Sequence, residues 1–256
     1  MKTIAISGKG GTGKSTIAAL IVRWLSEFQS GAVLAVDADS NVNLNDLLGI
    51  SVVETIGSIR EEMRKATQNL PGGMSKAQFL EYKIQASLVE TPSYDLIAMG
   101  RPEGPGCYCY ANNLLRDILH TLSKNYRYII IDNEAGMEHL SRRTTQNIDY
   151  LLVVSDPTVR GVLTAARISR LLDELDTRIG KKCVILNRVQ RDVPPAVCRA
   201  LEKKDLRQCL CIPEDNSLFE SDQKGNSIWT LPGLSPAFLA VDTWMKTVIN
   251  TTPKGQ

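Results

Sequence analysis

The residues of this chain that are best suited to chemistry lie near its N-terminus, in the pattern G-x-x-x-x-G-K-S. The pattern starts at Gly8 and ends with Lys14 and Ser15. An apolar run precedes it and an amphipathic helix pattern follows it, which is the context of a phosphate-binding loop. Glycines let backbone N–H groups curl around an anion, and the helix adds its positive N-terminal end. The pattern therefore predicts a nucleotide site in which Lys14 contacts the outer phosphates and the Ser15 hydroxyl binds Mg²⁺.

The loop carries a second lysine, Lys9, in the segment "KGGTGKS". Here the chain resembles the deviant Walker A family of P-loop NTPases, which includes MinD, ParA and the nitrogenase iron protein. The resemblance implies that Lys9 reaches across a dimer interface to the partner's nucleotide and acts in catalysis and assembly. Alternatively, Lys9 is one more phosphate cation within its own subunit. The predicted phosphate-binding set is Gly8, Lys9, Gly10, Gly11, Thr12, Gly13, Lys14, Ser15 and Thr16.

Carboxylates follow two of the apolar runs. Asp37 and Asp39 end the run at 32–36, and Asp132 ends the run at 128–131. Carboxylates at such strand ends lie beside the phosphate loop, where Mg²⁺ and the attacking water must be held. By resemblance, Asp39 positions or deprotonates the water, while Asp37 and Asp132 support the Mg²⁺ shell. One of the first two could instead cap a helix at residues 43–48.

Two further segments resemble the switches of the family. Ala135 and Gly136 resemble the second switch, whose turn senses the γ-phosphate, and the preceding Glu134 could be only a helix N-terminal charge. In the first switch the family often has proline where this chain has Ser40.

Candidate base contacts come later in the chain. Asn187 follows the apolar run at 182–186, and Pro213 and Glu214 follow the run at 209–212. Relatives commonly read adenine with an asparagine and a proline-containing loop at similar places. Pro213 could instead simply end its strand.

Two pairs of cysteines have C-x-C spacing. Cys107 and Cys109 lie in the glycine- and proline-rich segment "GPGCYCYANN". In an extended segment, residues two apart point to one side, so both sulfurs face one point. Two thiolates are half of a four-coordinate site for nickel or zinc, and a two-fold axis would supply the other half. The alternatives are a buried turn or a local redox pair.

The other cysteines are expected to be structural. Cys209 and Cys211 fall in an apolar run that predicts a central strand with both side chains buried on one face. Cys183 is expected to pack in its strand and Cys198 in its helix.

The elements that must position these residues alternate along the whole chain. Short apolar runs predict strands at 3–7, 32–37, 95–99, 128–132, 150–155, 182–186 and 209–212. Helical patterns between them include 14–27, 56–69, 111–124, 161–175 and 194–204. This order predicts one α/β domain over residues 1–256, a mostly parallel sheet flanked by helices on both faces.

Composition sets limits on the environment and the partners. The formal net charge is +2, which gives no bulk electrostatic argument for nucleic acid. No apolar run approaches the roughly 18 residues that span a bilayer, and no signal peptide pattern is present. We therefore expect a cytoplasmic protein with reduced cysteines, no nucleic acid partner and no membrane partner.

The combination of motifs is more specific than any one of them. The segments "GKGGTGKST", "CYCYANNLL" and "DNEAGMEHLSR" occur in this order. They resemble the CooC-type nickel-insertion accessory ATPases of carbon monoxide dehydrogenase and acetyl-CoA synthase. The resemblance implies ATP hydrolysis to ADP in an ATP-promoted homodimer, a C-x-C metal site between subunits, and delivery of Ni²⁺ to the apo-enzyme. The alternatives are an iron–sulfur reductase-type protein and a ParA- or MinD-like positioning ATPase.

Overall fold

The computed structural model describes residues 1–65, 73–101, 108–134, 147–173 and 178–250. Within these ranges lies a sheet of eight strands in the order β3-β4-β2-β5-β1-β6-β7-β8. The strands are β1 (Lys2–Gly8), β2 (Val33–Ala38), β3 (Val89–Glu90), β4 (Asp95–Ala98), β5 (Tyr128–Asn133), β6 (Asn147–Ser155), β7 (Arg178–Val189) and β8 (Gln208–Pro213). All neighbours pair in parallel except β3, which runs antiparallel to β4. The predicted α/β class with a mostly parallel sheet is confirmed.

The central strands are apolar on both sides because both sides are covered. Every residue of β2 and β5 is buried. Successive residues of these strands join different hydrophobic clusters: Ala35 and Ile130 belong to one, and Val36 and Ile131 to the other. This alternation is the expected result of a pleated strand between two helical layers.

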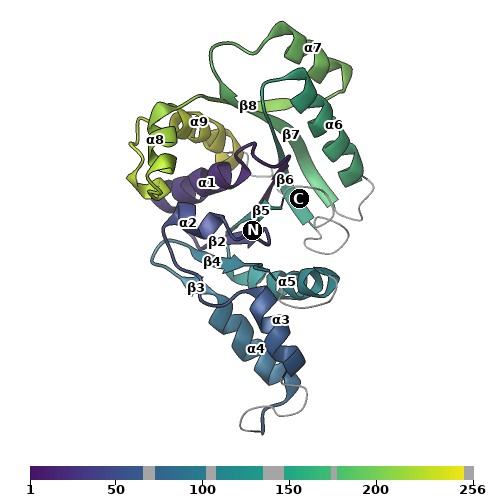
Figure 1. The fold of residues 1–256 in the computed structure, drawn as a ribbon, viewed down its shortest axis with the longest axis vertical. Coiled ribbons are helices and arrows are strands. Elements are labelled where there is room, and N and C mark those ends of the chain that lie inside the picture. The colour runs from purple at the N-terminus through teal and green to yellow at the C-terminus, as the bar shows by residue number, and fades with distance from the viewer. Residues whose placement is uncertain (66–72, 102–107, 135–146, 174–177, 251–256) are drawn as a thin grey trace.

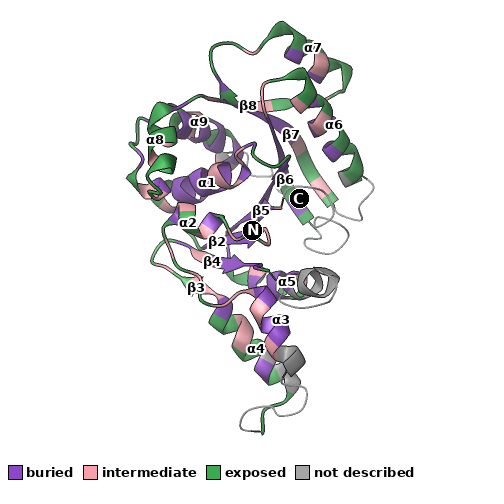
Figure 2. Ribbon diagram, in the orientation of Figure 1, coloured by how far each residue is buried: buried purple, intermediate pink, exposed green. Residues whose placement is uncertain are grey.

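Helices form a layer on each face of the sheet. They are α1 (Lys14–Phe28), α2 (Leu44–Leu48), α3 (Ile56–Lys65), α4 (Lys76–Ser87), α5 (Tyr108–Leu122), α6 (Val159–Asp173), α7 (Pro195–Lys203), α8 (Asn216–Gln223) and α9 (Pro236–Asn250), with 3-10 turns η2 (Ser123–Asn125) and η3 (Ile228–Thr230). Helices α1, α2 and α9 share one hydrophobic cluster, and α3, α5, α6 and α7 share the other. Figure 1 shows α1 and α9 on one side of the strands and α6 on the other. Figure 2 shows that buried residues fill the strands and the inner sides of the helices. Of the helices in the described ranges, none has the length and apolar character needed to cross a membrane.

Helix α1 is the element that fixes the phosphate loop, because it starts at the last residues of the motif. Its apolar residues recur at helical spacing and are buried, among them Ile17, Leu20 and Leu25. The Trp24 indole Nε1 donates to Asp242 Oδ1 at 2.8 Å, which ties α1 to α9. The start of α1 is therefore anchored from within the core.

The sequence prediction for β8 is wrong in two respects. The strand lies at the edge of the sheet, not in its centre. Cys209 packs partly against one hydrophobic cluster and Cys211 against the other, so the two side chains do not share a face. The reason is a register shift between Val184 and Ile185, which adds one residue to β8 and reverses its alternation from that point.

The expectation of reduced cysteines is also wrong for one pair. Cys183 of β7 and Cys209 of β8 form a disulfide, with Cα atoms 5.6 Å apart. Cys198 is an exposed free thiol on α7, where helix packing was predicted. Its neighbour Val197 occupies the buried side of that helix instead.

Candidate nucleotide site

The phosphate loop connects the end of β1 to the start of α1. Gly13 precedes the helix in a left-handed conformation with φ 90°. A Cβ atom at this position would lie 2.4 Å from the Asn187 side-chain Nδ2, so the close approach requires glycine. The buried Thr12 donates its hydroxyl to the Lys9 carbonyl at 2.8 Å and closes the loop on itself. These contacts make the loop a closed turn between β1 and α1.

The two lysines of the loop lie in different environments. Lys14 is buried, with 7% of its surface exposed, whereas Lys9 is exposed together with Gly10 and Gly11. The first turn of α1 contains no acidic residue, so no side chain of that turn neutralises the positive end of the helix. A bound phosphate would meet a buried ammonium group, while Lys9 extends from the loop into solvent.

Two buried aspartates lie side by side on adjacent strands beside this loop. Asp37 at the end of β2 is the register partner of Asp132 at the end of β5. Asp37 accepts N–H bonds from Asp39 at 2.9 Å and from Asn43 and Leu44 at 2.8 Å each. Burial raises the pKa of Asp37 to about 6, and these three donors oppose the shift. Asp37 therefore organises the turn that follows β2 and starts α2.

Asp132 is different, because neither carboxylate oxygen has a hydrogen-bond partner among the described residues. Burial raises its pKa to about 7. The Ser15 hydroxyl and the Lys14 ammonium lie near enough to oppose the shift, although Ser15 makes no hydrogen bond of ordinary geometry to it, and Asp37 and Asp39 reinforce the shift. A buried carboxylate without partners, beside a hydroxyl, fits a divalent cation with oxygen ligands. The residues present therefore fit Mg²⁺.

The segment after β2 lies at the rim of the site. Asp39 is half-buried, and its Oδ1 accepts bonds from the Asn41 backbone N–H at 2.8 Å and from its side chain at 3.1 Å. The Ser40 hydroxyl donates to Glu134 Oε1 at 3.1 Å. A proline at position 40 could not donate this bond, so here serine links the segment after β2 to the segment after β5. Ala135 and Gly136 lie outside the described residues.

A cavity of about 600 Å³ adjoins the phosphate loop and brings the predicted base contacts together. Asn187, Pro213 and Glu214 all line it, as do Gly13 and Thr16. Its further walls come from α1 and α8 and include Ile17, Leu20, Leu218, Phe219 and Asp222. A pocket of this size beside a phosphate loop suits a nucleoside.

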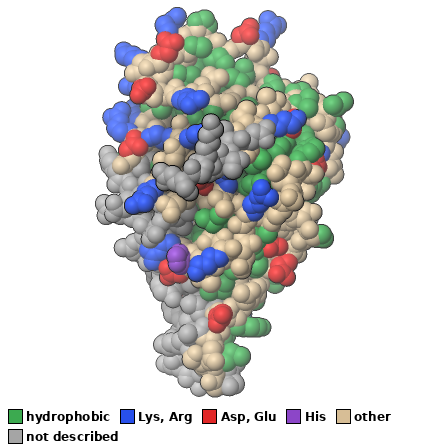
Figure 3. Space-filling view, turned by 180° about the vertical axis from the view of Figure 1, so that it is seen from behind, with side chains coloured by type: hydrophobic (Ala, Val, Ile, Leu, Met, Phe, Trp, Pro, Cys, Tyr) green, Lys and Arg blue, Asp and Glu red, His purple; other side chains and the backbone are tan. Residues whose placement is uncertain are grey.

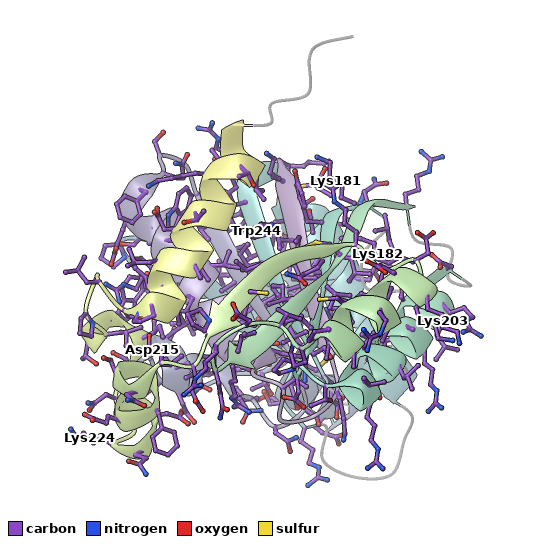
Figure 4. The ribbon with its side chains drawn as sticks, turned by 90° about the horizontal axis from the view of Figure 1, so that it is seen from above. Lys181, Lys182, Lys203, Asp215, Lys224 and Trp244 are labelled. Atoms are coloured by element: carbon purple, nitrogen blue, oxygen red, sulfur yellow. A yellow bond between two sulfur atoms is a disulfide. The ribbon has the colours of Figure 1, made fainter. Side chains whose placement is uncertain are left out.

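Helix α8 was not predicted, although its start signal is in the sequence. Asp215 caps the helix by accepting from the backbone of Ser217 at 2.9 Å and of Leu218 at 3.2 Å. Its other oxygen accepts from the Ser235 hydroxyl and from the Ala237 N–H. Burial alone would raise the pKa of Asp215, but these hydrogen bonds hold it below its usual value. Figure 4 shows Asp215 at the start of α8 and Lys224 just beyond its end.

The part of the cavity that the ends of β7 and β8 form with α8 is called the base end of the site. Asn187 and Arg188 connect this base end to the phosphate loop. The Asn187 Nδ2 donates to the Thr12 carbonyl at 2.8 Å, and its Oδ1 accepts from the Arg188 N–H at 3.0 Å. Arg188 has φ 59° and donates its Nη1 to the Gly11 carbonyl at 3.1 Å. In this structure the Asn187 side chain holds the phosphate loop in place, a role different from the base contact that the sequence suggested. Sequence reasoning missed Arg188, whose left-handed backbone and wall position mark it as part of the site.

The predicted C-x-C metal site lies largely outside the residues that the structure describes. Cys107 lies outside the described residues, and Cys109 lies in the first turn of α5. In the part of the chain that the structure describes, no group of three or more His, Cys, Asp or Glu side chains could hold a metal ion. The pair remains a prediction.

These features define a nucleotide-binding protein of the P-loop class. The family model "CobQ/CobB/MinD/ParA nucleotide binding domain" matches residues 3–228, and the chain belongs to this family. An uncharacterized ATP-binding protein of Methanocaldococcus jannaschii is 41% identical over 249 residues, covering 96% of this chain and 98% of the relative. The carbon monoxide dehydrogenase accessory protein CooC of Rhodospirillum rubrum is 33% identical over 251 residues, covering 91% and 90%.

Solved structures with the same fold include two members of the family. MinD of Pyrococcus horikoshii with Mg-ADP aligns with a TM-score of 0.68 at 23% identity, covering 96% of this chain and 95% of that one. A ParA family ATPase from Chlorobium tepidum aligns with a TM-score of 0.72 at 22% identity, covering 95% and 96%. At this identity the likeness establishes the fold alone.

Proposed function

We propose that this chain is a Mg²⁺-dependent ATPase that works as an ATP-promoted homodimer and delivers nickel to a metalloenzyme. The observation that carries the ATPase part is the buried carboxylate of Asp132, which lies beside Ser15 and Lys14 and has no hydrogen-bond partner among the described residues. Mg²⁺ held by the Ser15 hydroxyl, with Asp37 and Asp132 behind it, would neutralise charge on the transferred phosphoryl group. Lys14 would bind the outer phosphates from its buried position.

Asp39 is the residue proposed to orient the attacking water and accept its proton. Its carboxylate is half-buried at the rim, close enough to Asp132 for its charge to raise the pKa of that group. By contrast, Asp37 is committed to three backbone N–H groups, which favours a supporting role for it. Hydrolysis then releases phosphate next to the Ser40–Glu134 hydrogen bond, where the two switches meet.

Lys9 is proposed to act across the dimer interface. Its side chain is exposed and no ion pair to it is present within the described part of the subunit. Charge-assisted bonds to a partner's phosphates would give this cation a ligand only in the dimer. ATP would then promote dimerisation because the nucleotide forms part of the contact surface.

The nickel role rests on the resemblance of the cysteine segment and on the relative named as a carbon monoxide dehydrogenase accessory protein. Cys107 and Cys109 of both subunits would bind one Ni²⁺, or Zn²⁺, on the symmetry axis. The ion is cargo, and the client would be apo carbon monoxide dehydrogenase or acetyl-CoA synthase. Because nucleotide state changes how the subunits meet, it would also change metal affinity.

A membrane-positioning role is disfavoured by the packing of α9. Its apolar residues Phe238, Val241 and Met245 are buried against the core, so they are not free to lie on a bilayer. Figure 3 shows acidic and basic side chains interspersed over the face opposite to that of Figure 1, a pattern unlike a basic stripe for nucleic acid. Both features argue against the positioning alternatives and favour a protein client.

The experiment is metal analysis of the dimer, with and without a Cys107→Ala, Cys109→Ala double substitution. Wild-type protein with Mg²⁺ and a non-hydrolysable ATP analogue should hold one nickel ion per dimer, and the double variant none. Client activation should be lost with the metal. A double variant that retains one ion per dimer would refute the C-x-C site, and full client activation without metal would refute delivery.

A further inference from the structure

The disulfide between Cys183 and Cys209 joins the edge strand of the sheet to its neighbour. Cys183 is buried, with 7% of its surface exposed, and Cys209 is half-buried. Strand β8 has β7 as its one neighbour in the sheet that the structure describes. The disulfide is thus a covalent link at one edge of the sheet, where a strand has backbone pairing on one side alone.

Both of the linked strands run directly into the nucleotide cavity. Four residues beyond Cys183, β7 presents Asn187, which holds the Thr12 carbonyl of the phosphate loop. Beyond Cys209, β8 presents Ile212 and Pro213 to the cavity wall. The position of β8 relative to β7 therefore sets the width of the base end.

Backbone pairing alone holds this position weakly. The ladder is interrupted twice, between Val184 and Ile185 and again between Leu186 and Val189. An edge strand with an irregular ladder opens more readily than a central one. A crosslink removes much of that freedom, because it limits the states that the open strand can reach.

We propose that Cys183–Cys209 is a redox-modified site that controls nucleotide affinity, tight in the disulfide form and weak in the dithiol form. The inference rests on the proposed ATP-binding function. The reductant is a protein or small-molecule dithiol. Its thiolate attacks the more accessible Cys209 sulfur and expels the Cys183 thiolate, and its second thiol then attacks the mixed disulfide and releases Cys209. Two electrons pass to the protein, two protons complete its thiols, and the reductant becomes a disulfide.

Because ATP binding and the redox state of the cysteine pair are coupled, each must affect the other. If the disulfide form binds ATP more tightly by some factor, bound ATP must stabilise the disulfide by the same factor. A tenfold difference corresponds to a shift of about 30 mV in the two-electron midpoint. The midpoint potential of the cysteine pair, measured with and without ATP, is thus a second readout that does not require ATP turnover.

The test compares ATP affinity of the oxidised protein with that of protein reduced by a dithiol. We expect the reduced form to bind at least about fivefold more weakly. A Cys183→Ala, Cys209→Ala variant should bind like the reduced wild type and lose its response to reductant. Cys198→Ser, which removes an exposed free thiol, should respond as wild type does.

Three results would overturn the inference. One is the absence of a Cys183–Cys209 crosslinked peptide from protein held in an oxidising buffer. Another is equal ATP affinity in the two redox states of the wild type, a measurement that does not depend on whether any variant folds. These leave the proposed function intact. Failure of both states to bind ATP would overturn the proposed function and this inference with it.

Discussion

The two ends of the nucleotide site are built in different ways. The phosphate end consists of one continuous loop and two strand ends, with Asp37 and Asp132 in register across the sheet. The base end is assembled from the end of β7, the end of β8 and helix α8. The Glu214 N–H donates to the Val189 carbonyl at 3.0 Å and joins the two strand ends, and the Asn187–Thr12 hydrogen bond ties β7 to the phosphate loop. Chemistry in this site therefore depends on a local motif, whereas fit to the base depends on tertiary packing. Substitutions at the first end should change binding and turnover sharply, and those at the second should change affinity by smaller factors.

The largest effect on ATP binding is expected at Lys14. Lys14→Ala removes the buried ammonium group of the phosphate end, which would form charge-assisted bonds to the outer phosphates. Such bonds contribute about 1.5–3 kcal/mol each, so the loss of two predicts ATP binding weaker by on the order of 100-fold or more. Calorimetric titration with Mg-ATP measures this. The control variant Lys246→Ala, on the surface of α9, should bind Mg-ATP with normal affinity. Tight binding by Lys14→Ala would mean that Lys14 does not hold the phosphates.

A change confined to turnover is expected at Asp39. Asp39→Ala should keep ATP affinity within about threefold while the rate of phosphate release falls by about 10²–10⁴-fold, because the water is no longer oriented. The measurement is single-turnover hydrolysis with affinity determined in parallel. Asp173→Ala, a surface carboxylate on α6, serves as the control. A normal rate in the Asp39 variant would mean that another carboxylate performs the chemistry.

A pH-dependent effect on stability is expected at Asp132. Its pKa is raised by burial to about 7, against an unfolded value of 3.8, so the folded state binds the proton more tightly. The contribution of Asp132 to stability is therefore fully present below pH 3.8 and is lost as pH rises through 7. Without nucleotide or Mg²⁺, Asp132→Asn should be more stable than wild type at pH 8, by a few kcal/mol at most, and similar near pH 4.

Denaturant unfolding at the two pH values, in the presence of a chelator, measures the difference. Adding Mg-ATP should reverse the order at pH 8, because the amide is a poorer partner for the cation than the carboxylate. A variant less stable than wild type at pH 8 without Mg²⁺ would contradict the unpartnered state of Asp132.

The smallest effect is expected at Phe219 of the base end. This ring lines the cavity with 63% of its surface exposed, so truncation removes little from the core. Stacking of a base on an aromatic ring predicts that Phe219→Ala weakens ATP binding by about three- to tenfold without a change in thermal stability. Leu234→Ala, also exposed but outside the cavity lining, is the matched control. Equal affinity in both variants would mean that Phe219 does not contact the base.

The difference between the two ends also explains what the sequence could predict. Gly8, Lys14 and Ser15 follow from spacing because each residue type meets a local requirement of phosphate or Mg²⁺ binding. The strands followed from continuous apolar runs, except the two-residue β3, which is too short to show a pattern. Arg188 and the pairing of Cys183 with Cys209 depend on which strands become neighbours, and spacing along the chain does not contain that information.

Other errors have local physical causes. The register shift in β8 reverses the alternation of Cys209 and Cys211, and a period-two pattern cannot reveal an inserted residue. Helix α8 has a readable cap at Asp215 but only eight residues and a mixed surface, so its periodicity is weak. The capping signal after "IP" could have located it.

The most direct test of the central claim is the mass of the protein under native conditions with Mg²⁺, nickel and a non-hydrolysable ATP analogue. The account predicts a dimer that carries two nucleotides and one nickel ion, which reverts toward monomer when ADP replaces the analogue. Lys9→Ala should bind nucleotide yet remain largely monomeric. A nucleotide-saturated monomer in the wild type, or an unchanged dimer in Lys9→Ala, would contradict the claim that ATP joins the two subunits.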